Sequence, residues 1–360
     1  TRSTTPRGSL RRGPVAGAVL VLTLSYFPIV TFAVNAALRR YDPRVEDPAR
    51  LAGGGLRTFA GVTLPLLGPT VLGAGTLVFV LALVEFGVPS FLQVNVYAVE
   101  IYERFSLAYD PAEAAALSTP PIACGAIACA LWYVYARPRR GRLTGAPEQQ
   151  RPPAPGPVRA ASLVAGWTLV SLASAAPLAA LVARSLPCTS YRDVWVSTRE
   201  EIGVGLATAV ASATFMTVLA YAMALTARRR DRWARLFPLS LVAFLASGPV
   251  TGIGLILLWN RPGLPGLVYD SVLILVAGCA ARFLVFAYAG AAIALREVPL
   301  RFEEAAAVCG VPWGRRATGL LLPLAAPGLA AVWGLCFVLS FREIDAAVLT
   351  APPGLSTPAI

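Results

Sequence analysis

The stretch "LPLAAPGLAAVWGLCFVLSFREID", Leu322–Asp345, decides the fold. Residues 322–341 carry no charge, so the run supplies the roughly 20 apolar residues that one membrane-spanning helix needs. Three charged side chains, Arg342, Glu343 and Asp345, stand at its end. Such a run predicts a transmembrane helix that brings charged groups close to one face of the bilayer.

The rest of the chain repeats this character. Of the 360 residues, 56% are hydrophobic and only 14% are charged, whereas soluble domains average about 25% charged residues. We therefore expect an all-α integral membrane protein, a polytopic helical bundle with about eight transmembrane helices. The predicted spans are 15–38, 66–92, 112–136, 160–183, 202–227, 236–259, 271–295 and 322–349.

The arginines predict the orientation of these spans. All 31 basic residues are arginine, and the net charge is +12. Twenty arginines lie in the loops 39–65, 137–159, 228–235 and 296–321, and only 5 in the alternate loops. Because basic residues concentrate on the cytoplasmic side, we expect the first set of loops to be cytoplasmic. Arginines confined to short loops between apolar runs do not indicate nucleic-acid binding.

Two kinds of site are disfavoured by the composition. The chain has no histidine, which removes histidine acid–base chemistry and histidine metal ligands. Its six cysteines form no CxxC pair, and we interpret them as small apolar packing residues. No metal site and no catalytic residues are expected.

An internal repeat divides the chain. Residues 64–92 match residues 322–350 without a gap at an offset of 258, with Pro65 matching Pro323 and Glu85 matching Glu343. Upstream, with one residue deleted, 46–65 aligns with 303–323. Internal repeats at such separations indicate duplicated structural units. We expect two homologous halves, 1–136 and 160–360, joined by a cytoplasmic Pro/Arg-rich linker, 137–159.

The helices around the two copies differ in number. In the first half, one predicted span precedes the polar loop and two follow it. In the second half, three predicted spans precede the polar loop and one follows it. We therefore expect this sequence to be part of a larger two-half protein, incomplete at both ends.

The polar segment before the second repeat, "RFEEAAAVCGVPWGRR", predicts a short helix outside the bilayer. Alanine favours helix, and Glu303 and Glu304 stand where the helix dipole favours negative charge. Gly310 ends the helix, and Pro312 prevents its continuation. Alanine side chains allow a partner backbone to approach closely, so we interpret the segment as a docking element.

These residues resemble the EAA motif of binding-protein-dependent ABC importer permeases. The motif "EEAAAVCG" is followed, thirteen residues after its glycine, by Pro323. Two copies of the segment, with "WNRPGLPGLVYDSVLILVAGCAARF" and "FREIDAAVLTAPPGLSTP", resemble the fused two-half permeases of the ferric-iron and thiamine type. The first copy departs from the motif, because Asp47 and Pro48 replace Glu and Ala and one residue is missing.

The resemblance implies a coupling helix that inserts into a cytoplasmic ABC ATPase dimer, and a solute delivered by an extracytoplasmic binding protein. It implies a multi-pass protein of the bacterial inner membrane that transports its solute without being an enzyme. The chain lacks the GxxxxGK[ST] loop that holds ATP phosphates, so ATP and magnesium would bind the partner ATPase, and no cofactor is expected here. The residues implied in ATPase coupling are Glu303, Glu304, Ala305, Ala306, Gly310, Asp47, Ala49 and Gly53.

Charges inside the membrane form a second candidate site. Such charges usually pair or face water. One hypothesis places Glu85 and Glu343 along the translocation path or its gate, with Arg282, Arg342 and Asp345. The alternative hypothesis is that they form ion pairs that lock helices together, with Arg282–Glu343 as the candidate pair.

The solute stays open at this point. The resemblance favours ferric iron, but the same machinery also carries thiamine, phosphonates or polyamines. A secondary transporter with repeats is the rival from another class; it would need no matched cytoplasmic motifs. A polytopic membrane enzyme is a further rival, but no converging catalytic set is present. Co-purification with an ATPase would separate these possibilities.

Overall fold

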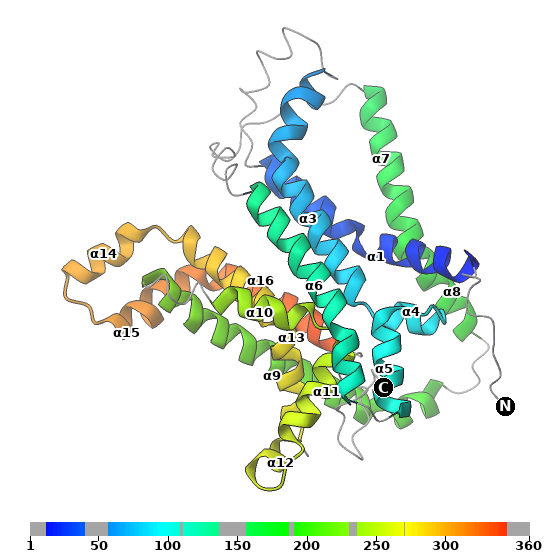
Figure 1. Cartoon of the computed structure of the whole chain (residues 1–360). Helices are drawn as coiled ribbons and strands as arrows, with labels where there is room; N and C mark the ends of the chain where they lie inside the picture. Colours follow the sequence, from blue (N-terminus) through cyan, green and yellow to red (C-terminus); the bar gives the residue numbers. More distant parts are fainter. Residues whose placement is uncertain are drawn as a thin grey trace, which may run out of the picture. The chain divides into compact units, whose positions relative to one another are not determined.

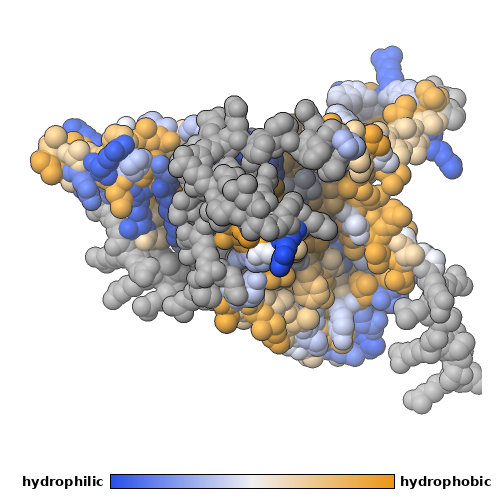
Figure 2. All heavy atoms as spheres, turned by 90° about the horizontal axis from the view of Figure 1, so that it is seen from above, coloured by the Kyte–Doolittle hydropathy of each residue, from blue (hydrophilic) through white to orange (hydrophobic). Residues whose placement is uncertain are grey.

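A computed structural model of the chain describes residues 12–39, 57–108, 111–136, 156–186, 191–229, 236–269 and 271–343. Within these residues the structure is helical and contains no strand (Figure 1). Seven of the helical segments are long and apolar enough to cross a membrane. The predicted all-α membrane class is therefore confirmed. Figure 2 shows hydrophobic residues over broad parts of the described surface, as lipid contact requires.

The chain divides into two compact units. Unit 1 comprises Thr1–Asn95 and Ala123–Thr189, and unit 2 comprises Val96–Ile122 and Ser190–Ile360. Helix α6, Pro111–Ala136, contributes its first part to unit 2 and its second part to unit 1. The predicted division into halves at the 137–159 linker stays a prediction.

Unit 1 is built around α1 and α3, which pack against each other. One contact of α6 depends on a small residue of α3. Trp132 of α6 donates a hydrogen bond to the Pro69 carbonyl (2.9 Å) and lies where a side chain on Gly73 would be. The helical elements of unit 1, apart from α6, are α1 Arg12–Arg39, η2 Phe59–Thr63, α3 Leu64–Val84, α4 Gly87–Phe91, α7 Gly156–Val170, η4 Ser171–Ala175 and α8 Ala176–Ser185.

Unit 2 is built around three mutually packed helices, α9, α13 and α16. Small residues let them approach closely, as is common between membrane helices. A Cβ added to Gly328 of α16 would lie 2.6 Å from the Ala294 Cβ of α13. The elements of unit 2, apart from α6, are α5 Tyr97–Ala108, α9 Tyr191–Arg229, α10 Leu236–Leu245, α11 Gly248–Trp259, α12 Leu264–Tyr269, α13 Leu273–Glu297, α14 Leu300–Val308, α15 Trp313–Arg316, η6 Ala317–Leu321 and α16 Leu322–Phe341.

The predicted span 236–259 is wrong as a single helix. It consists of α10 and α11, separated at Ala246 and Ser247. Ser247 is extended (φ −63°, ψ 157°), and Pro249 stands in the first turn of α11. A proline there cannot donate to the preceding turn, and its ring clashes with the carbonyl four residues back, so the helix starts anew.

The two matched sequences share one backbone feature. A π-helical turn precedes each matched helix, η2 before α3 and η6 before α16, at the same offset of 258 residues. The amide of Leu64 bonds the carbonyl five residues earlier, and so does that of Leu322. Each of these residues is followed by the matched proline, Pro65 or Pro323, which has no amide hydrogen to continue an α-helical ladder. The helix widens by one residue just before the proline.

Candidate functional site

The helix expected at 303–309 is present as α14, Leu300–Val308. Gly310 ends it in the left-handed region at φ +72°. Its amide bonds the Ala307 carbonyl, and the Val311 amide bonds the Ala306 carbonyl, both at 3.0 Å. This pair of bonds is a Schellman motif, which satisfies the last carbonyls of the helix. In Figure 1, α14 and α15 lie together at one end of the α9–α13–α16 bundle.

One face of α14 is open to a partner. Glu304, Ala305 and Ala307 are exposed, and 89% of Val308 is exposed. Ala306 is half-buried. The exposed alanines and Val308 form a shallow apolar surface, and the carboxylate of Glu304 lies beside it. This arrangement fits docking into a groove of another protein.

Glu303 faces the other way, unlike its neighbour Glu304. Its side chain is 11% exposed, and its Oε2 lies 3.3 Å from Nε of Arg228 on α9. The sequence placed Glu303 among the docking residues, but the structure shows it in an intramolecular ion pair. The helical period explains the difference, because residues adjacent in a helix point about 100° apart.

Arg228 was missed by sequence reasoning. Its guanidinium donates to the carbonyls of Leu295 and Val298, the latter at 3.0 Å, besides pairing with Glu303. We call these groups the Arg228 cluster. A signal was available, because an arginine at a helix end often binds free carbonyls. The sequence alone could not say that these carbonyls belong to another helix.

The predicted pair Arg282–Glu343 forms, and it is deeply buried. Nη1 of Arg282 donates to Oε1 of Glu343, and the two residues are 5% and 8% exposed. Arg282 lies within α13, and Glu343 lies two residues beyond the end of α16. Cys279 and Ser340, both buried, lie beside the pair. The pair therefore ties α13 to the end of α16 inside unit 2.

Glu85, the counterpart of Glu343 in the repeat, has a different partner. Tyr26 of α1 donates a hydrogen bond to its Oε2 at 2.6 Å. The predicted helix 66–92 is interrupted here, because α3 ends at Val84 and Glu85 is extended (ψ 126°) before α4 begins. Both repeated glutamates thus lie within two residues of a helix end, and each is bound by a side chain of another helix. No sequence signal pointed to Tyr26.

The structure describes only some of the other predicted site residues. Arg342 caps α16 and is exposed. Asp345 lies outside the described residues, and so do the three residues of the first coupling copy, Asp47, Ala49 and Gly53. Within the described ranges, no three metal-ligating side chains come together.

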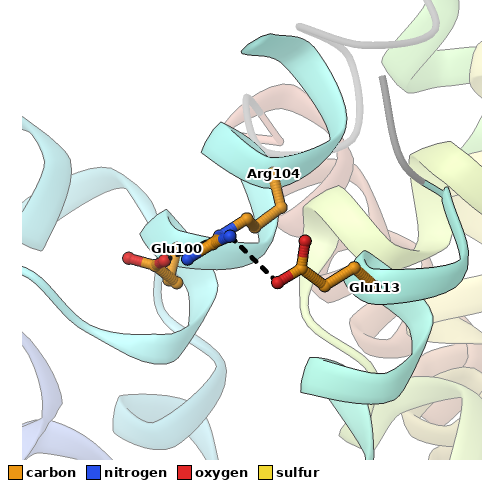
Figure 3. A network of polar contacts seen from close by, with 3 residues as sticks. All are labelled: Glu100, Arg104 and Glu113. Carbon is orange, nitrogen blue, oxygen red and sulfur yellow. Dashed lines mark hydrogen bonds and ion pairs between the residues drawn. The ribbon is translucent and has the colours of Figure 1, made fainter. Parts of the chain in front are cut away.

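A further polar network lies at the expected extracytoplasmic side (Figure 3). Arg104 of α5 lies between Glu100 of the same helix (3.0 Å) and Glu113 at the start of α6 (2.9 Å). The hydrogen bond that Arg104 donates to Glu100 and the negative charge of Glu113 raise the pKa of the Arg104 guanidinium above its ordinary value. The network links α5 to the start of α6, and because it is exposed it contributes little to stability.

Comparison with known proteins identifies the second half of the chain. Residues 201–360 match the family described as the binding-protein-dependent transport system inner membrane component. A stretch of 103 residues is 30% identical to the Fe(3+)-transport system permease protein FbpB 2 of Haemophilus influenzae, covering 28% of this chain and 20% of that protein. A stretch of 72 residues is 39% identical to the molybdenum transport system permease protein ModB of Escherichia coli K12, covering 20% of this chain and 31% of ModB. The matched stretches thus span a third or less of these relatives.

Proposed function

We propose that this chain is the permease subunit of an ATP-driven importer, because residues 201–360 match the family of binding-protein-dependent inner membrane components. It is a multi-pass protein of the bacterial inner membrane. The chain contains no lysine and hence no GxxxxGK[ST] loop. ATP hydrolysis is therefore assigned to a separate ATPase subunit, which binds the nucleotide and magnesium.

The observation that carries this proposal is α14. Its inner side is fixed by Glu303, while Glu304, Ala305 and Val308 face outward. The loop that contains it, 296–321, is on the side that the arginines assign to the cytoplasm. We assign docking of the ATPase to Glu304, Ala305, Ala306 and Gly310, with Asp47, Ala49 and Gly53 as their counterparts in the first half.

The membrane charges are proposed as a gate. Arg282 and Glu343 are buried together at the end of α16, and Glu85 occupies the matched position after α3. A buried ion pair that opens exposes two charges to a water-filled path, and a closed pair neutralises them. Arg342 caps the same helix, and Asp345 follows Glu343 by two residues in the sequence. Glu85 and Glu343, one from each repeat, are the glutamates that we assign to the path or its gate.

For the solute, ferric iron is the leading candidate, since one relative is named as an iron permease. Molybdate is the second candidate, because ModB shares 39% identity over its matched stretch. Thiamine, phosphonates and polyamines stay as alternatives. Selection of the solute is assigned to an extracytoplasmic binding protein.

The test is ATP-dependent uptake into proteoliposomes. The full protein, its ATPase and its binding protein are reconstituted, and accumulation of ferric iron and of molybdate is measured in parallel. We expect uptake of one solute that requires both ATP and the binding protein. Uptake driven by a proton gradient without an ATPase would contradict the proposal and favour a secondary transporter.

A further inference from the structure

We propose that Arg228 is the positioning residue that makes α14 move together with the cytoplasmic ends of α9 and α13. The inference rests on the proposed function, in which a partner ATPase displaces α14. It adds a residue that neither the repeat nor the motif identifies, and it explains how a displacement at the loop would reach the membrane helices.

The geometry of the Arg228 cluster joins three elements through one side chain. Arg228 is the penultimate residue of α9. One guanidinium nitrogen donates to Leu295, whose carbonyl is among the last of α13, and another donates to Val298, which caps that helix. The third nitrogen, Nε, faces Glu303 of α14 at 3.3 Å. All five donors of arginine sit on one planar group, so these contacts are geometrically linked.

Burial makes these contacts stronger than a surface ion pair. The side chains of Arg228 and Glu303 are 12% and 11% exposed. Exposed pairs contribute little because water screens them, whereas removing one partner of a buried pair leaves an unpaired charge. The positive charge also lies at the C-terminus of α13, where the helix dipole favours it. Lysine cannot reproduce the three contacts, because its ammonium is a single point.

The two adjacent acids of α14 therefore have separate roles. Glu304 faces outward toward a docking partner, and Glu303 faces inward toward Arg228. A force applied at the outer face passes through Glu303 and Arg228 to α9 and to the end of α13. Helix α13 also carries Arg282 of the buried pair. The cluster thus connects the docking surface with the Arg282–Glu343 pair, within unit 2.

A first experiment tests the cluster in the full protein without any partner. Hydrogen–deuterium exchange is measured on the amides of Ala305–Val308 in the wild type and in Arg228→Gln, Arg228→Lys and Glu303→Gln. We expect exchange at least about tenfold faster in Arg228→Gln and Glu303→Gln, and an intermediate effect in Arg228→Lys. Arg296→Gln is the matched control, since it removes the same charge from an exposed position nearby and should exchange like the wild type. Wild-type exchange in both Arg228→Gln and Glu303→Gln would overturn the inference.

A second experiment tests movement with the ATPase. Spin labels are placed on Ala222 of α9 and Ala307 of α14, both exposed, in a background without the native cysteines. In the otherwise wild-type protein we expect one narrow distance distribution that MgATP leaves unchanged, and in Arg228→Gln a distribution that shifts on adding MgATP. An unchanged distribution in Arg228→Gln, with the ATPase bound, would contradict the positioning role. If no ATPase binds even the wild type, the proposed function fails, while the exchange experiment still decides whether the cluster holds α14.

Discussion

Substitution of Glu343 by glutamine is the sharpest perturbation of the buried ion pair. The change keeps the size of the side chain but removes the charge that faces Arg282, and both residues are more than nine-tenths buried. Breaking a buried pair from one side costs about 3–5 kcal/mol. A lone charge near the membrane centre costs about 2.5–3.5 kcal/mol on insertion scales. The two estimates overlap near about 3 kcal/mol, which is a large part of a typical free energy of unfolding.

The assay is a double-mutant cycle on the free energy of unfolding in mixed detergent micelles. It compares the wild type, Glu343→Gln, Arg282→Gln and the double variant. We expect each single change to destabilise by about 3 kcal/mol, and the double variant to lose less than the sum by about 1–3 kcal/mol. Arg342→Gln, an exposed neighbour, is the control and should change stability little. Additive losses would refute the ion pair as a stabilising contact.

The same variants separate the two hypotheses for the pair. If the double variant folds, ATP-driven uptake can be measured without an unpaired buried charge. A gate predicts altered uptake, either lost or no longer dependent on ATP. Uptake equal to that of the wild type would leave the pair with a structural role only.

Three further predictions concern single contacts. Gly310→Ala should destabilise the end of α14 by about 1–2 kcal/mol and speed its amide exchange, because φ is +72° at this position. No atom lies within 4 Å of the added Cβ, so the effect would come from the backbone conformation and not from a clash. Unchanged amide exchange would contradict this prediction. Gly328→Val should reduce the yield of folded protein, since an added Cβ would lie 2.6 Å from a neighbouring alanine. Gly334→Val is the control and should not reduce the yield, because no atom lies within 4 Å of a Cβ added there. Equal yields would refute close packing at Gly328. Tyr26→Phe removes the 2.6 Å hydrogen bond to Glu85 and should lower the free energy of unfolding by about 1.5–3 kcal/mol, and a loss below that range would show that the contact is dispensable.

Much of the fold follows from the sequence, because the signals are long or chemically strict. Apolar runs of about 20 residues predicted the spans, and the matched Pro65 and Pro323 predicted the repeat; a π turn precedes each of these two prolines. Gly310 ends α14 as expected, since a left-handed position favours glycine. These features depend on local chemistry and need no knowledge of partners in space.

Other features depend on context that the sequence does not carry. A proline inside an apolar run can widen a helix, as Pro177 does after η4, or divide it, as Pro249 does. An apolar run also marks only the apolar part of a helix. The run predicted that α9 starts at residue 202, whereas the helix starts at Tyr191 and its first turns carry charged residues.

The same limit applies to the candidate site. The sequence showed two adjacent glutamates in α14 but not which one faces inward. That outcome depends on Arg228, which is 75 residues away in the chain. Likewise, the pair Arg282–Glu343 was one of two hypotheses for the membrane charges, and only the packing of α13 against α16 decides between pairing and exposure.

The central claim is that α14 docks an ATPase, and site-specific photo-crosslinking tests it most directly. A photoreactive residue replaces Val308 on α14, which is 89% exposed, and in a second variant replaces Leu267 on α12, which is 69% exposed in a loop assigned to the other side of the membrane. In cells that express the full protein, irradiation should join position 308, but not position 267, to an ABC ATPase subunit. An ATPase adduct at neither position, or at both equally, would contradict the account.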